Sequence, residues 1–164
     1  MKRLLLFLSI IAITAGCTQA QSPAAERAQH LAPYRMLSID STWITPAQLK
    51  KNKPVMLIYF SPDCGHCQRL IYEMKPKMKE FSNAQIVMIT FAQYRAIKEF
   101  YNSYGLKAYP NIIMGTEGYT YNVQRYYEIK TTPFVAIYDH KGKLVQIFDK
   151  QPKVEDLAAA VKKA

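Results

Sequence analysis

The sequence predicts one α/β domain, a three-layer sandwich in which helices cover both faces of a mixed central sheet. Two observations lead to this prediction. Short apolar runs typical of buried strands alternate with segments whose apolar residues recur every three or four positions, as in helices. The chain then ends with two strand-like runs joined by a tight turn and one amphipathic helix. The length of 164 residues suits one domain with an extension at one end.

The expected elements follow one another from residue 36 onward. They are short strand pieces in 36–43, a helical turn at 45–49, a buried strand at 55–60, a helix from 63 or 64 to 81, a strand at 85–91, a helix at 92–104, a strand at 111–114, a helix at 120–129, a hairpin of 134–138 and 143–148, and a last helix at 154–161. Pro76 lies inside the first long helix and is expected to kink it, because proline lacks the N–H of the helical hydrogen bond.

The N-terminus has the pattern of an export signal. A short basic start is followed by an apolar run of signal-peptide length, too short to span a bilayer comfortably. The two small residues before Cys17 resemble the bacterial lipoprotein processing box, which implies a signal peptide at 1–16 and a lipid on Cys17. Ordinary cleavage a few residues later is the alternative. Residues 17–33 are then expected to be a tether, and 34–164 the domain. Either way the domain is exported, to the periplasm or the cell surface, where disulfides persist.

The chemistry of the chain points to two of its three cysteines. With Cys17 lipidated or removed, the domain keeps Cys64 and Cys67, spaced C-x-x-C at the predicted junction of a buried strand and a helix. A helix N-terminus lowers the pKa of a thiol, so Cys64 is expected to be the nucleophile. Cys67, one turn later, is placed to resolve a mixed disulfide. His66 is expected to tune the redox couple by adding positive charge, whereas Asp63 opposes this unless it caps the helix.

Other interpretations of the cysteine pair have less support. A zinc site needs two more ligands, but His30 lies in the expected tether and His140 in an expected turn, so no metal is expected. Covalent haem needs a histidine where the sequence has Gln68. A purely structural disulfide would close a very short loop and gain little from chain entropy. The prediction is therefore redox chemistry through a Cys64–Cys67 disulfide, with no dissociable cofactor.

The run from Ser61 to Gln68, Ser-Pro-Asp-Cys-Gly-His-Cys-Gln, resembles the active-site run of thioredoxin-fold oxidoreductases. Its Gly-His dipeptide is similar to that of protein disulfide isomerases, whereas the layout of residues 36–163 more closely resembles the exported TlpA/ResA-type group. The resemblance implies a thioredoxin-like fold with an N-terminal extension and a strand–helix insertion before the terminal hairpin. It also implies disulfide chemistry on protein substrates, which most of this group carry out as reductases.

The same resemblance assigns a role to Thr132 and Pro133, which directly precede the expected hairpin. In the family a cis-proline at this place faces the dithiol, and the backbone before it pairs with the substrate chain. A cis Thr132–Pro133 bond and substrate binding by Thr132 are therefore implied. A trans proline at the start of a strand is the alternative.

Besides Asp63 in place of the usual aromatic and the late helix proline Pro76, two positions depart from the family pattern. Ile58 stands where a buried acid usually accepts the proton of the resolving thiol, and Leu70 stands where ResA-type reductases carry a glutamate. The proton acceptor for Cys67 is therefore open. Glu73 and Glu128 are candidates, although both are more typical of surface acids.

Taken together, these features predict an extracytoplasmic thiol–disulfide oxidoreductase, tethered to a membrane and acting as a reductase of protein disulfides. A disulfide oxidase or isomerase is the alternative within the class, because the Gly-His dipeptide favours a more oxidising couple. A non-catalytic binding module with a stable disulfide is the alternative outside it. The expected partners are substrate proteins with disulfides or thiols, and a second thiol–disulfide protein that transfers electrons. The net charge of +10 comes without a nucleic-acid-binding motif, so no nucleic acid is expected.

Overall fold

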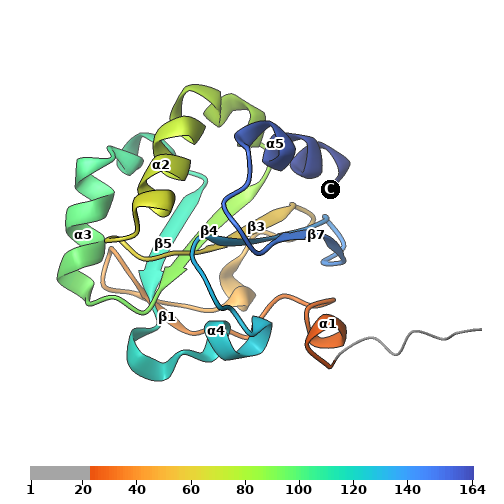
Figure 1. Cartoon of the computed structure of the whole chain (residues 1–164), viewed down its shortest axis with the longest axis horizontal. Helices are drawn as coiled ribbons and strands as arrows, with labels where there is room; N and C mark the ends of the chain where they lie inside the picture. The colour runs from red at the N-terminus through yellow and green to blue at the C-terminus, as the bar shows by residue number, and fades with distance from the viewer. Residues whose placement is uncertain (1–22) are drawn as a thin grey trace, which may run out of the picture.

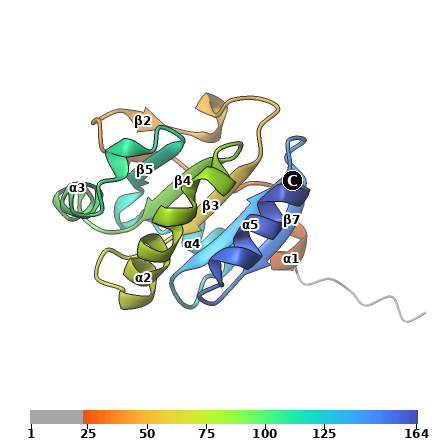
Figure 2. The same cartoon turned by 90° about the horizontal axis from the view of Figure 1, so that it is seen from above.

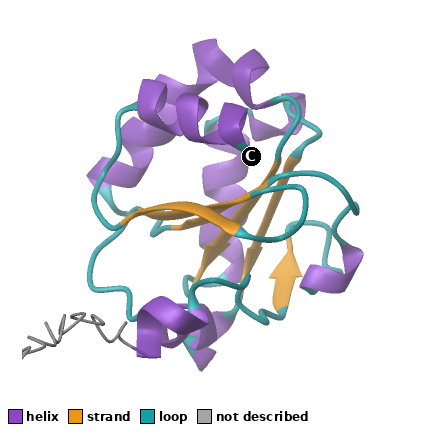
Figure 3. Ribbon diagram, turned by 90° about the vertical axis from the view of Figure 1, so that its right-hand side faces the viewer, coloured by secondary structure: helices purple, strands orange, loops and turns teal. Residues whose placement is uncertain are grey.

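A seven-stranded sheet lies at the centre of the molecule with helices on both faces (Figures 1 and 3). The computed structural model describes residues 23–164. Its elements in chain order are α1 (Pro23–Arg27), β1 (Met36–Ser38), β2 (Trp43–Ile44), η1 (Pro46–Gln48), β3 (Val55–Tyr59), α2 (Gly65–Met74), η2 (Lys75–Phe81), β4 (Gln85–Thr90), α3 (Tyr94–Ser103), η3 (Leu106–Ala108), β5 (Ile112–Thr116), η4 (Gly118–Thr120), α4 (Asn122–Tyr127), β6 (Phe134–Tyr138), β7 (Leu144–Phe148) and α5 (Val154–Lys163), with η for 3-10 helices. The predicted signal peptide and Cys17 lie outside the described residues.

The sheet is mixed, as predicted. Its strand order is β2-β1-β5-β4-β3-β6-β7. The pairs β3–β4 and β4–β5 are parallel, and the other neighbours are antiparallel. All residues of β3, β4 and β6 are buried, which explains why they form continuous apolar runs in the sequence. Between α3 and the hairpin, β5 and α4 form the expected strand–helix insertion.

Two hydrophobic clusters hold the layers together, one on each face of the sheet. Successive side chains of a strand point to opposite faces. Along β3, therefore, Met56 and Ile58 join the cluster under α2, α3 and α5, while Leu57 and Tyr59 join the one under α1 and α4. Figure 2 shows α2 and α5 lying over the strands. The dithiol belongs to the first of these two faces.

The first long helix changes type at the proline rather than continuing with a bend. The sequence predicts one kinked helix to residue 81, but α2 ends at Met74 and the 3-10 helix η2 begins at Lys75. Pro76 donates no hydrogen bond, so the α-helical pattern cannot continue through it. The predicted helix at 120–129 is also shorter. It ends at Tyr127 because Glu128 adopts a left-handed backbone with φ of 54°.

The N-terminal segment differs most from expectation. The sequence predicts a tether at 17–33, yet the structure packs residues 23–33 against α4 and the sheet. Ala28 and Ala32 are only 3% and 1% exposed, although they precede the expected domain boundary at residue 34. Side chains from the rest of the domain form hydrogen bonds with backbone groups of this segment, and such contacts need no apolar periodicity in its sequence. The folded unit therefore includes residues 23–33.

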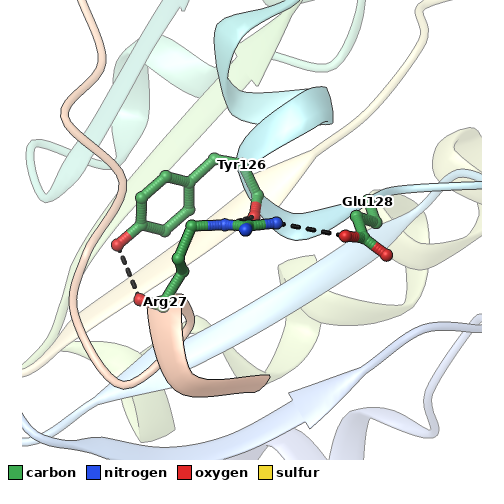
Figure 4. Close-up of polar contacts among 3 residues, drawn as sticks. All are labelled: Arg27, Tyr126 and Glu128. Carbon is green, nitrogen blue, oxygen red and sulfur yellow. Dashed lines mark hydrogen bonds and ion pairs between the residues drawn. The ribbon is translucent and has the colours of Figure 1, made fainter. Parts of the chain in front are cut away.

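Tyrosine hydroxyls make most of these hydrogen bonds. Ala32 N–H donates to the Tyr127 hydroxyl, which pairs with the Tyr138 hydroxyl, and this in turn bonds the carbonyls of Ala28 and His30. Figure 4 shows the outer part of the contact. The Tyr126 hydroxyl donates to the Arg27 carbonyl at 2.6 Å, and the Arg27 side chain pairs with Glu128 at 3.1 Å. The segment thus fixes the C-terminal end of α4.

Candidate active site

Strand register brings the two predicted halves of the site together. Tyr59, the last residue of β3, pairs with Phe134, the first residue of the antiparallel strand β6. The residues after β3 and before β6 therefore lie at the same edge of the sheet. Cys64 follows β3 and Thr132 precedes β6, and the Cys64 thiol donates a hydrogen bond to the Thr132 carbonyl at 3.3 Å. The peptide bond between Thr132 and Pro133 is cis, as the resemblance implies.

Cys64 is the N-cap residue of α2, and its thiol is partly exposed. Burial by itself would raise the pKa of this thiol. The sulfur, however, also receives hydrogen bonds from the Thr132 side chain, from the Cys67 thiol and from the backbone N–H groups of Cys67 and His66. Together these bonds outweigh burial and lower the pKa of Cys64, because they stabilise the thiolate. The two backbone donors belong to the first turn of α2, so the helix N-terminus contributes to lowering the Cys64 pKa beside Thr132 and the Cys67 thiol.

Cys67 lies one turn deeper and is only 1% exposed. Burial is the main reason that its pKa rises to about 12 from an ordinary value of 9.0. A backbone N–H of Ser61 and the Thr132 side chain lower the pKa of Cys67 but do not offset burial. Both cysteines are free thiols in the structure. The pair is therefore asymmetric: the Cys64 thiol is partly exposed and its pKa is lowered, whereas the Cys67 thiol is buried and its pKa is raised.

The structure brings no carboxylate to Cys67. Ile58 and Leu70, which stand where the family has acids, are buried in the same apolar cluster as Cys67. Glu73 is exposed, and Glu128 is bound to Arg27 on the opposite face of the sheet. Burial, Ser61, Thr132 and Cys64 set the Cys67 pKa, and none of them supplies a carboxylate. Within residues 23–164, no three His, Cys, Asp or Glu side chains come together as a metal site.

The loop after β7 completes the site in a way that the sequence does not indicate. The exposed His66 ring hydrogen-bonds through Nδ1 to Gln151 Oε1 at 2.7 Å. Five residues line a hollow of about 370 Å³ beside the dithiol: His66, Thr131, Thr132, Lys150 and Gln151. Lys150 and Gln151 belong to the link between the hairpin and α5, and no motif marks them. Within the active-site run, the Gln68 side chain donates a hydrogen bond to the Pro62 carbonyl at 2.8 Å, which stabilises the turn before Cys64.

Solved structures with this fold include several disulfide enzymes. A secreted Mycobacterium tuberculosis disulfide oxidoreductase homologous to E. coli DsbE is 17% identical, with a TM-score of 0.68, and the match covers 85% of this chain and 98% of that one. A thiol:disulfide interchange protein of the thioredoxin family from Chlorobium tepidum is 19% identical, with a TM-score of 0.67, and the match covers 83% and 95%. At such identities these structures show a shared fold.

No curated protein sequence matches the chain, but a family model does. No helix among residues 23–164 is long and apolar enough to cross a membrane. The family model described as a thioredoxin-like domain matches residues 46–164, which is more than two thirds of the chain and includes both cysteines and the cis-proline. The chain therefore belongs to the thioredoxin-like domain family.

Proposed function

We propose that the protein is an exported thiol–disulfide oxidoreductase that reduces disulfides of other proteins. The observation that carries this proposal is the asymmetry of the dithiol. Cys64 is accessible with a lowered pKa, and Cys67 is buried with a pKa of about 12. Disulfide exchange needs one thiolate to attack first and a second thiol to act only after the mixed disulfide has formed. A stable structural bridge would need no such difference.

The exchange takes place in two displacements. The Cys64 thiolate attacks one sulfur of the substrate disulfide, the substrate S–S bond breaks, and the leaving sulfur departs as a thiolate that takes up a proton. Cys67 then loses its proton and attacks Cys64 Sγ, which breaks the mixed disulfide and releases the second substrate sulfur. The substrate gains two electrons and two protons, and the enzyme keeps a Cys64–Cys67 disulfide. A dithiol protein of lower potential returns it to the reduced state.

Thr132 and His66 act on the first displacement. When Cys64 loses its proton, the Thr132 carbonyl no longer accepts the thiol hydrogen and is free to accept an N–H of the substrate backbone. The Thr132 hydroxyl stabilises the thiolate. His66 lies at the rim of the site, where its imidazolium form adds positive charge. Without a carboxylate at Ile58 or Leu70, the departing substrate thiolate is the nearest base for the Cys67 proton.

Export and reducing direction rest on other features. The basic and apolar start of the sequence supports export, and one of the similar structures is of a secreted protein. The two small residues before Cys17 support its lipidation. The reducing direction rests on the resemblance to the TlpA/ResA-type group. The mass of the mature protein tests the lipid, and Cys17→Ser should move the protein from the membrane to the soluble fraction.

The activity is tested by trapping the mixed disulfide. Cys67→Ala leaves Cys64 to attack but removes the resolving thiol, so substrate proteins should accumulate as adducts that dithiothreitol releases. The double variant Cys64→Ala/Cys67→Ala is the matched control and should trap nothing. A folded and exported Cys67→Ala protein that traps no adducts would contradict the proposal. Equilibration of the wild-type dithiol with glutathione then gives the potential, and a value above the glutathione couple would favour an oxidase.

A further inference from the structure

A second cavity adjoins the hollow beside the dithiol and reaches the N-terminal helix. This second cavity has a volume of about 420 Å³ and shares Thr131 and Lys150 with the first. Its walls come from three separate parts of the chain. They are Ala24, Ala25 and Ala28 in and after α1, residues 127–131 from the last residue of α4 onward, and Phe134, Ile147, Asp149 and Lys150 from the hairpin and the loop beyond it. We call this second cavity the α1 groove.

The α1 groove has an apolar floor. Phe134, Ile129 and Ala28 line it and are 4%, 7% and 3% exposed, and Ile147 lies beside them. These side chains belong to the cluster on the α1 face of the sheet. Because residues 23–33 pack onto the domain, α1 supplies one wall of the groove. An extended peptide could therefore place an apolar side chain against this floor.

The rim of the α1 groove is positively charged. Lys130 and Lys150 line it and are exposed. Two carboxylates lie beside them. The ion pair with Arg27 at 3.1 Å offsets the charge of Glu128. The two positive charges of Lys130 and Lys150 then exceed the single negative charge of Asp149. The net positive charge favours an occupant with acidic residues.

We propose that the α1 groove binds the segment of the substrate protein next to the attacked cysteine and selects segments that carry an acidic residue beside an apolar one. This inference rests on the proposed function. The Thr132 carbonyl lies 3.3 Å from Cys64 Sγ, so a substrate chain paired with Thr132 runs past Thr131 and Lys150. Because Thr131 and Lys150 line both cavities, the residues of that chain next to the attacked cysteine enter the groove. Alternate side chains would meet the apolar floor and the lysines.

The charge preference is tested with two disulfide-linked peptides that differ only in the residues beside one cysteine, Glu-Leu in one and Lys-Leu in the other. The readout is the ratio of kcat/KM for the two peptides. We expect the wild-type protein to prefer the acidic peptide by about three- to tenfold at low ionic strength, and the preference to shrink in 0.5 M salt. Charge reversal in Lys150→Glu or Lys130→Glu should remove or invert this ratio.

A lysine at the opposite end of the parallel strands provides the matched control. Cys64 follows the C-terminal end of β3, whereas Lys107 lies in η3, before the N-terminal end of β5, and β3, β4 and β5 are parallel. Lys107→Glu changes the net charge equally and should leave the peptide ratio unchanged. If wild type reduces both peptides equally, or if Lys107→Glu alters the ratio as much as Lys150→Glu, the groove does not select substrates.

The small neutral disulfide bis(2-hydroxyethyl) disulfide separates this inference from the proposed function. A wild-type protein that reduces this compound and both peptides without a charge preference keeps the proposed function and overturns the groove. A protein that reduces none of the three overturns both. If Lys150→Glu loses binding to anionic phospholipid vesicles while the peptide ratio stays unchanged, the lysines serve a membrane surface, and the inference is also overturned.

Discussion

The asymmetry between Cys64 and Cys67 predicts how fast each thiol is alkylated. We would compare the single variants Cys67→Ser and Cys64→Ser, each combined with Cys17→Ser so that one thiol remains. A thiol reacts with iodoacetamide as its thiolate, so the rate depends on the ionised fraction and on access. Cys64 is partly exposed with a lowered pKa, whereas Cys67 is 1% exposed with a pKa of about 12.

The size of the difference follows from these pKa values. A shift from 9.0 to about 12 lowers the thiolate fraction of Cys67 at pH 7 by about a thousandfold. A more basic thiolate is also more nucleophilic, and a Brønsted slope of about 0.4–0.5 recovers roughly 20-fold over this range. The Cys67 thiol should therefore react at least about 50-fold more slowly than an ordinary thiol. Cys64 should react faster than an ordinary thiol, and burial of Cys67 widens the gap further.

The assay is alkylation between pH 6 and 10, followed by mass spectrometry. The Cys64 rate should begin to level off below pH 9, whereas the Cys67 rate should still rise about tenfold per pH unit at pH 10. In guanidinium chloride the two unfolded variants should react equally, which shows that each thiol is chemically competent. Folded variants with rates within fivefold of each other, or a Cys67 midpoint near 9, would refute the argument.

Four further predictions concern single side chains. Thr132→Val removes a hydrogen bond to the Cys64 thiolate and should raise the Cys64 pKa, which moves the alkylation profile of Cys64 to higher pH. Tyr138→Phe removes buried hydrogen bonds to the N-terminal segment and should cost about 1–3 kcal/mol in urea unfolding, with faster hydrogen exchange in residues 28–32. Arg27→Ala, which removes an exposed ion pair with Glu128 and an exposed hydrogen bond to the Tyr126 carbonyl, should cost less than about 1 kcal/mol. Gly115→Ala should cost about 1–3 kcal/mol by the same measurement, because its Cβ would lie 2.8 Å from the Leu37 carbonyl oxygen.

Much of the fold could be predicted because its central strands are buried on both faces. A strand such as β4, with every residue buried, gives a continuous apolar run, whereas an element with one exposed face alternates apolar and polar residues. The dithiol could be predicted from its spacing and its place after such a strand. Thr132 and Pro133 came from the resemblance alone, and the contact of Thr132 with Cys64 depends on the pairing of Tyr59 with Phe134.

The parts that could not be predicted depend on contacts with no pattern in the sequence. Residues 23–33 dock through backbone groups, which every residue carries, and through small buried side chains such as Ala28 and Ala32, so no sequence pattern marks the contact. The bond between His66 and Gln151 joins residues 85 positions apart. The high pKa of Cys67 comes from burial, which only the packed structure reveals.

The docked start of the domain sets how far the active site could move from a membrane. Six Cα–Cα steps separate Cys17 from Pro23, which is at most about 20 Å of chain. With the proposed lipid on Cys17, the domain would stay within about its own diameter of the bilayer. The enzyme would then search for substrates in two dimensions, and its partners would be proteins that are themselves attached to, or passing along, the same membrane surface.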